Sequence, residues 1–226
     1  MARILSIETA TDVCSVAILE DKKLIAQQEL YVPRSHASRL AVMIEDILKQ
    51  AEIQGKDLDA VAVSKGPGSY TGLRIGVSTA KGFCYALDIP MLAVNTLSAM
   101  VQRASKSMPG YNYYIPMLDA RRMEVYTMVC DERGEEIEVT HATVLNEASF
   151  RSVLNKGRCL FIGDGARKAS MLIKHPNATF RDTLVPGARE TGEMAFRLFE
   201  EGKFEDVEKF EPFYLKDFVA TMPKAG

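Results

Sequence analysis

A glycine-rich turn between an apolar strand and a long helical pattern is the feature that most constrains the fold. Residues 60–63 are all apolar, which is typical of a strand that is covered on both faces. The strand leads into the run Gly66-Pro67-Gly68-Ser69-Tyr70-Thr71-Gly72, and a helical pattern follows to about residue 87. This strand–loop–helix sequence favours an α/β fold.

The order of the expected elements repeats once along the chain. In the first half we expect strands at 3–8, 13–19, 24–30, 60–63 and 91–94, and helices at 36–51, 71–87 and 96–106. In the second half we expect strands at 113–118, 123–130, 135–139, 159–162 and 178–180, and helices at 146–155, 165–174 and 190–201. The tandem β-β-β-α-β-α pattern predicts two related lobes, 1–106 and 107–226, with a hinge at 105–112 and with the last residues a candidate for packing back on the first lobe. This is the layout of actin, sugar kinases and heat-shock ATPases, which by itself settles no function.

Composition excludes several classes of protein. Hydrophobic residues make up 47% and charged residues 26% of the 226 residues, an ordinary balance for a globular protein. The formal net charge is −2, and neither half carries the excess of basic residues that nucleic-acid binding normally uses. Arg121-Arg122 is too small a cluster to change this. No apolar stretch is long enough to span a membrane, and the four separated cysteines fit buried free thiols, so we expect a cytoplasmic protein.

The glycine-rich turn has two interpretations that the sequence alone leaves evenly balanced. Free amides at the start of a helix favour phosphate or carboxylate, so Gly66, Gly68, Ser69 and Thr71 form a candidate anion-binding loop. The spacing matches neither a P-loop nor a dinucleotide-binding motif. The other interpretation is a tight turn in which glycine permits unusual backbone angles.

The helix after this turn carries two stripes of small or apolar residues. One stripe contains Leu73, Val77, Ala80, Cys84 and Leu87, and the other contains Gly72, Gly76, Thr79, Phe83 and Ala86. Gly76 and Gly82 each cost about 1 kcal/mol relative to alanine inside a helix, which suggests close approach by another backbone. That backbone belongs either to this chain or to a partner, and we favour a partner. The candidate interface comprises His36, Arg39, Leu40, Met43, Gly72, Gly76, Thr79 and Phe83.

Residues that would support catalysis are sparse. The three histidines, His36, His141 and His175, show no His-x-x-x-His spacing for zinc or iron. Glu8 is the carboxylate best placed for chemistry, at the end of the first strand. No glycine follows it in the first hairpin, and the matching hairpin at 119–122 has none either, so side chains would crowd a triphosphate. The sequence therefore argues against kinase or strong ATPase activity.

Several motifs are shared with one known family. They are Ser6-Ile7-Glu8-Thr9-Ala10-Thr11 with Cys14-Ser15-Val16-Ala17, Arg34-Ser35-His36, the run from Gly66 through Gly76, Ala80-Lys81-Gly82, and Pro212-Phe213-Tyr214-Leu215-Lys216. With these motifs the chain resembles the bacterial TsaB (YeaZ) family, most strongly over residues 1–100. One departure is Glu8, where the family more often has aspartate.

The resemblance implies an actin-like two-lobe α/β fold and a role in making threonylcarbamoyladenosine. This modification lies 3′ of the anticodon in tRNAs that read codons starting with A. In that pathway the paralogue TsaD holds a metal and transfers the threonylcarbamoyl group, TsaB binds and supports TsaD, and the ATPase TsaE docks on the pair. The resemblance thus implies TsaD and TsaE as partners, with tRNA contacted only through the complex and a homodimer left open.

The comparison with TsaD also implies a non-catalytic copy. TsaD-type chains carry Asn-His-x-x-x-His where this sequence has Asn95, Thr96 and Met100. Threonine is a poor iron or zinc ligand, and methionine prefers softer metals, so we expect no metal and no catalytic residue. We expect no cofactor, with a nucleotide at a shared interface left open. The alternatives are a stand-alone metalloprotease (glycoprotease), an actin-like phosphotransferase, or a direct tRNA-binding module.

Overall fold

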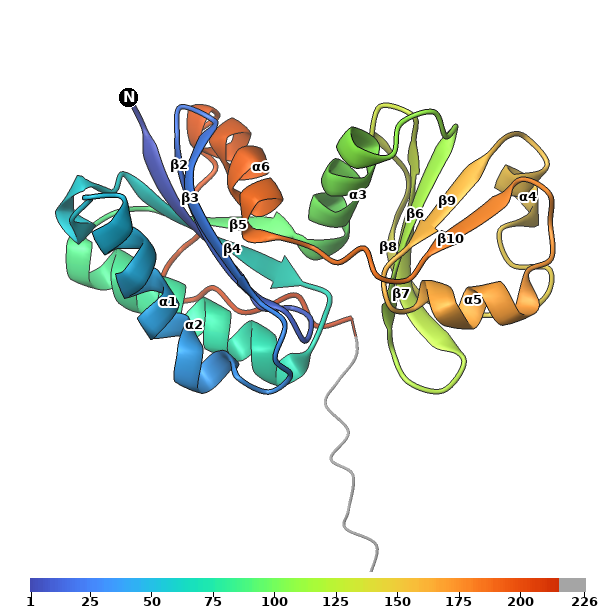
Figure 1. The fold of residues 1–226 in the computed structure, drawn as a ribbon, viewed down its shortest axis with the longest axis horizontal. Coiled ribbons are helices and arrows are strands. Elements are labelled where there is room, and N and C mark those ends of the chain that lie inside the picture. The colour runs from blue at the N-terminus through green and yellow to red at the C-terminus, as the bar shows by residue number, and fades with distance from the viewer. Residues whose placement is uncertain (216–226) are drawn as a thin grey trace, which may run out of the picture.

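Two five-stranded sheets with helices on both faces make up the two lobes of the chain (Figure 1). The computed structural model describes residues 1–215. The first half contains β1 (Arg3–Glu8), β2 (Cys14–Glu20), β3 (Lys23–Leu30), α1 (His36–Gln50), a 3₁₀ turn (Gly55–Asp57), β4 (Ala60–Gly66), α2 (Tyr70–Leu87), β5 (Met91–Asn95) and α3 (Thr96–Ser107). The second half contains β6 (Tyr113–Asp119), β7 (Glu124–Asp131), β8 (Glu136–Val144), α4 (Arg151–Leu154), β9 (Cys159–Ile162), α5 (Ala166–Leu172), β10 (Ala178–Arg181) and α6 (Ala188–Glu200).

The first sheet has the strand order β3-β2-β1-β4-β5. β2 is antiparallel to β1 and β3, whereas β1, β4 and β5 are parallel. Alternate side chains serve two cores: Leu5 and Ile7 pack with α1 and α2, and Ile4 packs with α6. β4 has the same alternation, which is why residues 60–63 read as a continuous apolar run.

The second sheet repeats the topology of the first. Its order is β10-β9-β6-β7-β8, with β6 antiparallel to β7 and parallel to β9. α5 contributes to the core on one face of this sheet, and α3 contributes to the core on the other. The tandem β-β-β-α-β-α pattern predicted from the sequence is thereby confirmed.

The packing of α3 and α6 does not follow a division of the chain into two lobes after residue 106. Leu97, Val101 and Ala104 of α3 pack with residues of the second sheet. Ala195 and Phe196 of α6 pack against the first sheet, to which the chain returns after β10 (Figure 1). Each lobe is therefore completed by a helix from the other half of the sequence.

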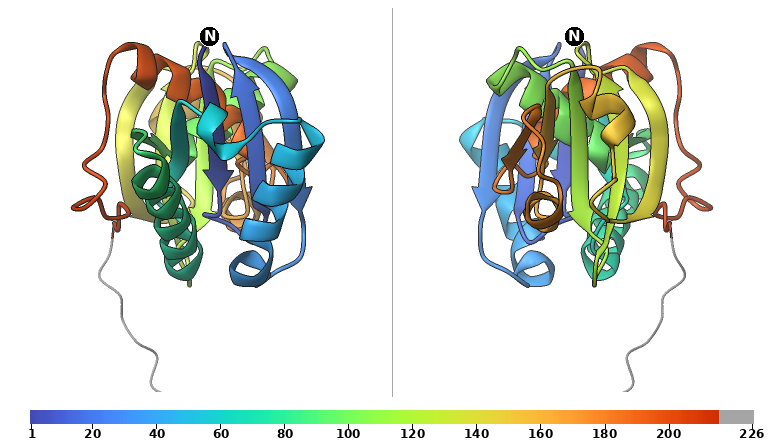
Figure 2. Two further views of the ribbon diagram at one scale, coloured as in Figure 1. Left: turned by 90° about the vertical axis from the view of Figure 1, so that its left-hand side faces the viewer. Right: turned by 90° about the vertical axis from the view of Figure 1, so that its right-hand side faces the viewer.

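The last described residues also lie on the first lobe. Glu205 donates its backbone N–H to Met91 O at 2.9 Å, and Phe213 donates to Lys65 O at 2.7 Å. The segment runs down the outside of this lobe in both views of Figure 2. Lys216 of the C-terminal motif lies outside the described residues.

One expected helix is much shorter in the structure. Only α4 forms within 146–155, and β8 extends to residue 144. The side chain of Asn146 accepts the Ala148 N–H, and the side chain of Ser149 accepts the Asn146 N–H. Phe150 has φ of 60°, outside the helical region. Such local side-chain bonds compete with helical ones, so the helix starts late.

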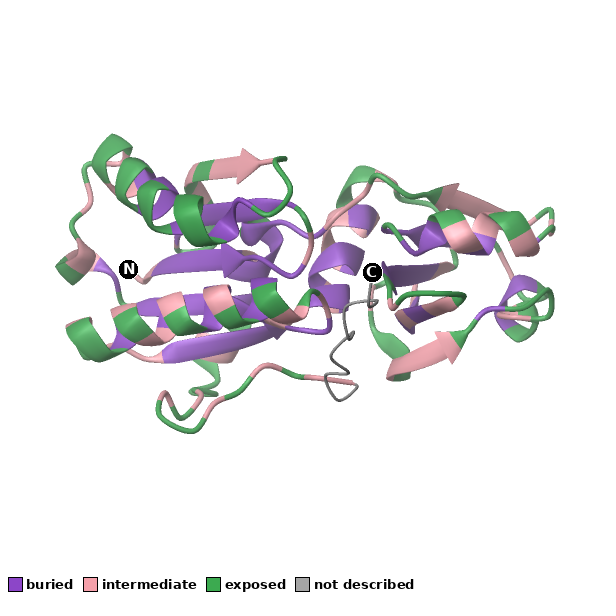
Figure 3. Ribbon diagram, turned by 90° about the horizontal axis from the view of Figure 1, so that it is seen from below, coloured by how far each residue is buried: buried purple, intermediate pink, exposed green. Residues whose placement is uncertain are grey.

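Burial follows the sheets and the inner sides of the helices (Figure 3). The four cysteines are buried and free, as the sequence predicted. Among residues 1–215, no helix combines the length and the apolar character that crossing a membrane requires.

Candidate functional site

The glycine-rich turn connects β4 to α2 and contacts two distant segments of the same chain. A Cβ at Gly66, which has φ of +111°, would lie 2.7 Å from the carbonyl oxygen of Phe213. A Cβ at Gly68 would collide with Ala10. Both positions therefore require glycine because backbone from this chain approaches closely.

The start of α2 is held by contacts within the chain. Ser69 donates its N–H to Ala10 O at 2.7 Å, and its Oγ accepts the N–H of Gly72 at 3.3 Å. Thr71 is exposed. Anion binding by the loop of Gly66, Gly68, Ser69 and Thr71 stays a prediction.

Gly72 and Gly76 are covered by a segment of this chain, and contact of either residue with a partner stays a prediction. Both are buried. A Cβ at Gly72 would overlap the carbonyl oxygen of Thr9, and a Cβ at Gly76 would overlap the hydroxyl of Thr9. Thr9 also donates its hydroxyl to Gly72 O at 2.8 Å. The close approach inferred from Gly76 is thus made by the β1–β2 turn of the same chain.

Three further members of the candidate interface face the interior. His36, Leu40 and Met43 are 6%, 1% and 3% exposed, and Leu40 and Met43 belong to the core between α1, α2 and the first sheet. An amphipathic helix buries its apolar stripe first against its own sheet, so these residues form the inner side of α1. They are covered in the folded chain, and their contact with a partner stays a prediction.

The remaining candidates lie at the surface. Arg39 is exposed, and Thr79 and Phe83 are half-buried. Thr79 belongs to an outer face of α2 whose other members are exposed and, apart from Tyr85, small: Thr71, Ser78, Gly82, Tyr85 and Ala86. Gly82 has nothing within 4 Å of the position of a Cβ, and Tyr85 is 82% exposed. Sequence reasoning noted the cost of Gly82 but did not separate this face from the buried one.

A carboxyl group is buried at the end of β1. Glu8 is fully buried, and its Oε1 accepts the Ala10 N–H at 2.8 Å and the Ser64 hydroxyl at 2.9 Å. Thr191 of α6 donates to Oε2 at 3.4 Å. Burial raises the pKa of Glu8 to about 7, although these hydrogen bonds act to lower it.

The start of α3 contains Thr96 and Met100, the two positions compared above with the histidines of TsaD-type chains. Thr96 and Met100 are both fully buried. The methyl group of Met100 lies where a Cβ on Gly163 would have to go, so it fills the junction between α3 and the β9–α5 turn. Thr96 Oγ1 has no hydrogen-bond partner within the described residues.

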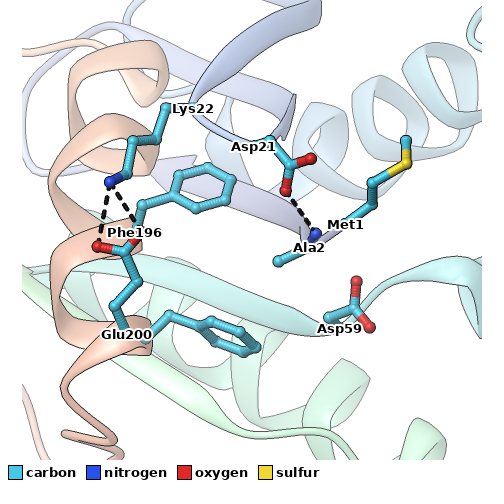
Figure 4. A pocket seen from close by; sticks show the side chains of 8 residues that line it. Met1, Ala2, Asp21, Lys22, Asp59, Phe196 and Glu200 are labelled. Carbon is cyan, nitrogen blue, oxygen red and sulfur yellow. Dashed lines mark hydrogen bonds and ion pairs between the residues drawn. The ribbon is translucent and has the colours of Figure 1, made fainter.

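A shallow hollow lies at the opposite end of the first sheet, where β1 and β4 begin (Figure 4). Its lining comprises Met1, Ala2, Asp21, Lys22, Asp59, Phe196, Phe199 and Glu200. Asp21 accepts the Ala2 N–H at 2.8 Å, and Lys22 pairs with Glu200 at 2.8 Å. Asp21, Lys22 and Glu200 therefore already have partners within the chain. The hollow is remote from Glu8 and the glycine-rich turn.

Comparison with known proteins identifies the family. Residues 13–157 match the family model TsaD, tRNA N6-adenosine threonylcarbamoyltransferase. The tRNA threonylcarbamoyladenosine biosynthesis protein TsaB of Escherichia coli K12 is 37% identical over 99% of both chains. The chain belongs to the TsaB family. Its function in tRNA threonylcarbamoyladenosine biosynthesis follows from this membership.

Solved structures agree with the TsaB assignment. A Pseudomonas aeruginosa protein described as similar to peptidase YEAZ is 28% identical, with a TM-score of 0.86 over 96% of this chain and all of that one. The activator of 2-hydroxyisocaproyl-CoA dehydratase from Clostridium difficile is 10% identical with a TM-score of 0.52, over 96% of this chain and all of that one, which shows a shared fold alone. The actin-like two-lobe α/β fold expected from the sequence is confirmed.

Within residues 1–215, no three His, Cys, Asp or Glu side chains are arranged to hold a metal ion.

Proposed function

We propose that the chain is a non-catalytic subunit that binds a TsaD-type transferase. In this proposal it supports transfer of threonylcarbamoyl to the adenosine 3′ of the anticodon in tRNAs that read codons starting with A. The observation that carries the proposal is the packing of Thr96 and Met100, which are fully buried at the start of α3. Neither side chain suits zinc or iron, and the methyl group of Met100 occupies the junction with Gly163.

The buried carboxyl group supports the same proposal. Glu8 Oε1 already accepts the Ala10 N–H, the amide that a phosphate oxygen would use at the first hairpin. That amide is therefore not free to bind a phosphate oxygen, so we infer that the chain alone holds no nucleotide. A nucleotide at an interface shared with the transferase would therefore rely on groups of the partner.

The outer face of α2 is the surface that supports partner binding. It carries small residues at Thr71, Ser78, Gly82 and Ala86, which allow another helix to approach closely, and Tyr85 is the kind of aromatic residue that contributes most at interfaces. The same face is available to a second copy of the chain. We infer that the transferase is its main occupant, and that the ATPase TsaE and tRNA engage the resulting complex.

Gly82→Leu is expected to weaken binding to a TsaD-type transferase by at least about tenfold, because the new side chain separates the two helices. The monomer tolerates this change, since a Cβ at Gly82 meets no atom within 4 Å. Calorimetric titration of the transferase measures the affinity, and thermal unfolding verifies the fold.

Ala148→Leu serves as the control for added bulk, because Ala148 is exposed on the second lobe. It is expected to bind with the affinity of the unmodified chain. Equal affinities for Gly82→Leu and Ala148→Leu would contradict the assignment of this face. Modified tRNA produced by the transferase with and without this chain tests the supporting role itself.

A further inference from the structure

The hairpin between β6 and β7 ends in two adjacent arginines. Its tip is closed by hydrogen bonds from Ala120 N–H to Glu124 O and from Glu124 N–H to Arg121 O, both at 3.1 Å. Asp119 Oδ1 accepts the Arg121 N–H at 2.6 Å. The tip projects below the second sheet in the view of Figure 1. It therefore presents Arg121 and Arg122 on a well-defined turn.

The backbone of this turn is unfavourable for arginine. Arg121 has φ of 71° and Arg122 has φ of 49°, the left-handed region that glycine and asparagine adopt most easily. Glycine or asparagine would adopt these angles at lower cost. Asp21 and Lys22 of the β2–β3 hairpin have similar angles, so the backbone alone does not mark a function.

Contacts within the chain do not account for the two side chains. Both are exposed, and neither guanidinium forms an ion pair with any residue in 1–215. By contrast, Arg3, Arg103 and Arg189 each pair with a glutamate. Two carboxyl groups lie at the base of the turn: Asp119 pairs with Lys168 Nζ at 2.7 Å, and Asp164 accepts the Asp119 N–H at 2.9 Å. The arginine pair is thus available to an external anion.

We propose that Arg121 and Arg122 contact backbone phosphates of tRNA when the chain is part of the transferase complex. The planar guanidinium group matches phosphate oxygens with two parallel hydrogen bonds, and such contacts position RNA without reading its sequence. Because the net charge of the chain is −2, the chain as a whole does not attract RNA, and any attraction of phosphate is local to this tip. The inference rests on the proposed function, because the complex supplies the remaining tRNA contacts.

The test is the double variant Arg121→Asn/Arg122→Gly, assembled with the TsaD-type transferase. Because the new residues suit the turn, the melting temperature of the isolated variant is expected to rise by about 3 °C. Affinity of the complex for tRNA is expected to fall by about three- to tenfold. A plot of log affinity against log salt is expected to become less steep by about 0.7–0.9 for each phosphate that the variant no longer neutralises.

Two further variants separate the outcomes. Arg133→Ala/Arg151→Ala removes the same charge from other exposed positions and is expected to retain tRNA affinity. Arg121→Lys/Arg122→Lys keeps both charges and is expected to keep most of the salt dependence of tRNA affinity. Unchanged tRNA affinity of the first variant, or loss of transferase binding in its place, would overturn the inference. Failure of the unmodified chain to bind the transferase would instead contradict the proposed function.

Discussion

Replacing Gly72 with alanine is expected to lower the free energy of unfolding by at least about 3 kcal/mol. The new methyl group would overlap the carbonyl oxygen of Thr9, which is backbone and cannot rotate away. The same shift would break the hydrogen bond from the Thr9 hydroxyl to Gly72 O. Urea unfolding followed by circular dichroism measures the difference.

The matched control is Gly82→Ala on the same helix. Its Cβ meets open space, so the alanine is expected to raise the free energy of unfolding by about 0.5–1 kcal/mol through helix propensity. Similar effects of both substitutions would show that Thr9 does not occupy the groove at Gly72. A large loss at Gly72 also means that substitutions at Gly72 or Gly76 report on folding and cannot be used to map an interface.

Glu8→Gln is expected to stabilise the chain above neutral pH and to have little effect in acid. The folded chain holds the Glu8 proton up to a pKa of about 7, whereas the unfolded chain releases it near 4.5. Between these values the folded state binds more protons, so the free energy of unfolding falls as the pH rises. The shift corresponds to about 3 kcal/mol, all of it lost above the folded pKa.

The glutamine amide can keep the hydrogen bonds with Ala10, Ser64 and Thr191 without carrying charge. The measurement is the difference in unfolding free energy between the variant and the unmodified chain from pH 4 to pH 8. It is expected to grow from near zero to about 3 kcal/mol. Glu147→Gln, at an exposed position, is the control. A difference that does not vary with pH would show that folding does not shift the pKa of Glu8.

The sequence predicts the elements of this fold well because periodicity reports burial directly. The apolar run at 60–63 and the stripes of α1 and α2 identify segments that must be covered. Periodicity does not identify which segment covers them. Gly76 therefore predicted a close approach, which Thr9 of the same chain makes, whereas Gly82, used in the same argument, meets no atom within 4 Å.

The site was less accessible to sequence reasoning for the same reason. Glu8 is recognisable as a carboxylate at the end of a strand. Its partners Ser64 and Thr191 are 56 and 183 residues away, and no local pattern links them. The outer face of α2 had a usable signal, because Gly82 falls outside both stripes. The division of lobes was missed because α3 and α6 have ordinary amphipathic patterns that fit either sheet.

The placement of α6 has a consequence for synthesis on the ribosome. Ser6 donates its hydroxyl to Ala188 O at 2.6 Å, and Ala188 donates its N–H to Ser15 Oγ at 3.0 Å. The amino-terminal strands emerge first, yet their α6-facing side stays uncovered until almost the whole polypeptide has been translated. Residues 113–181 have all their strands at hand before α6 has been made. Co-translational assembly should therefore proceed from the middle of the chain outward, against the usual amino-terminal-first order.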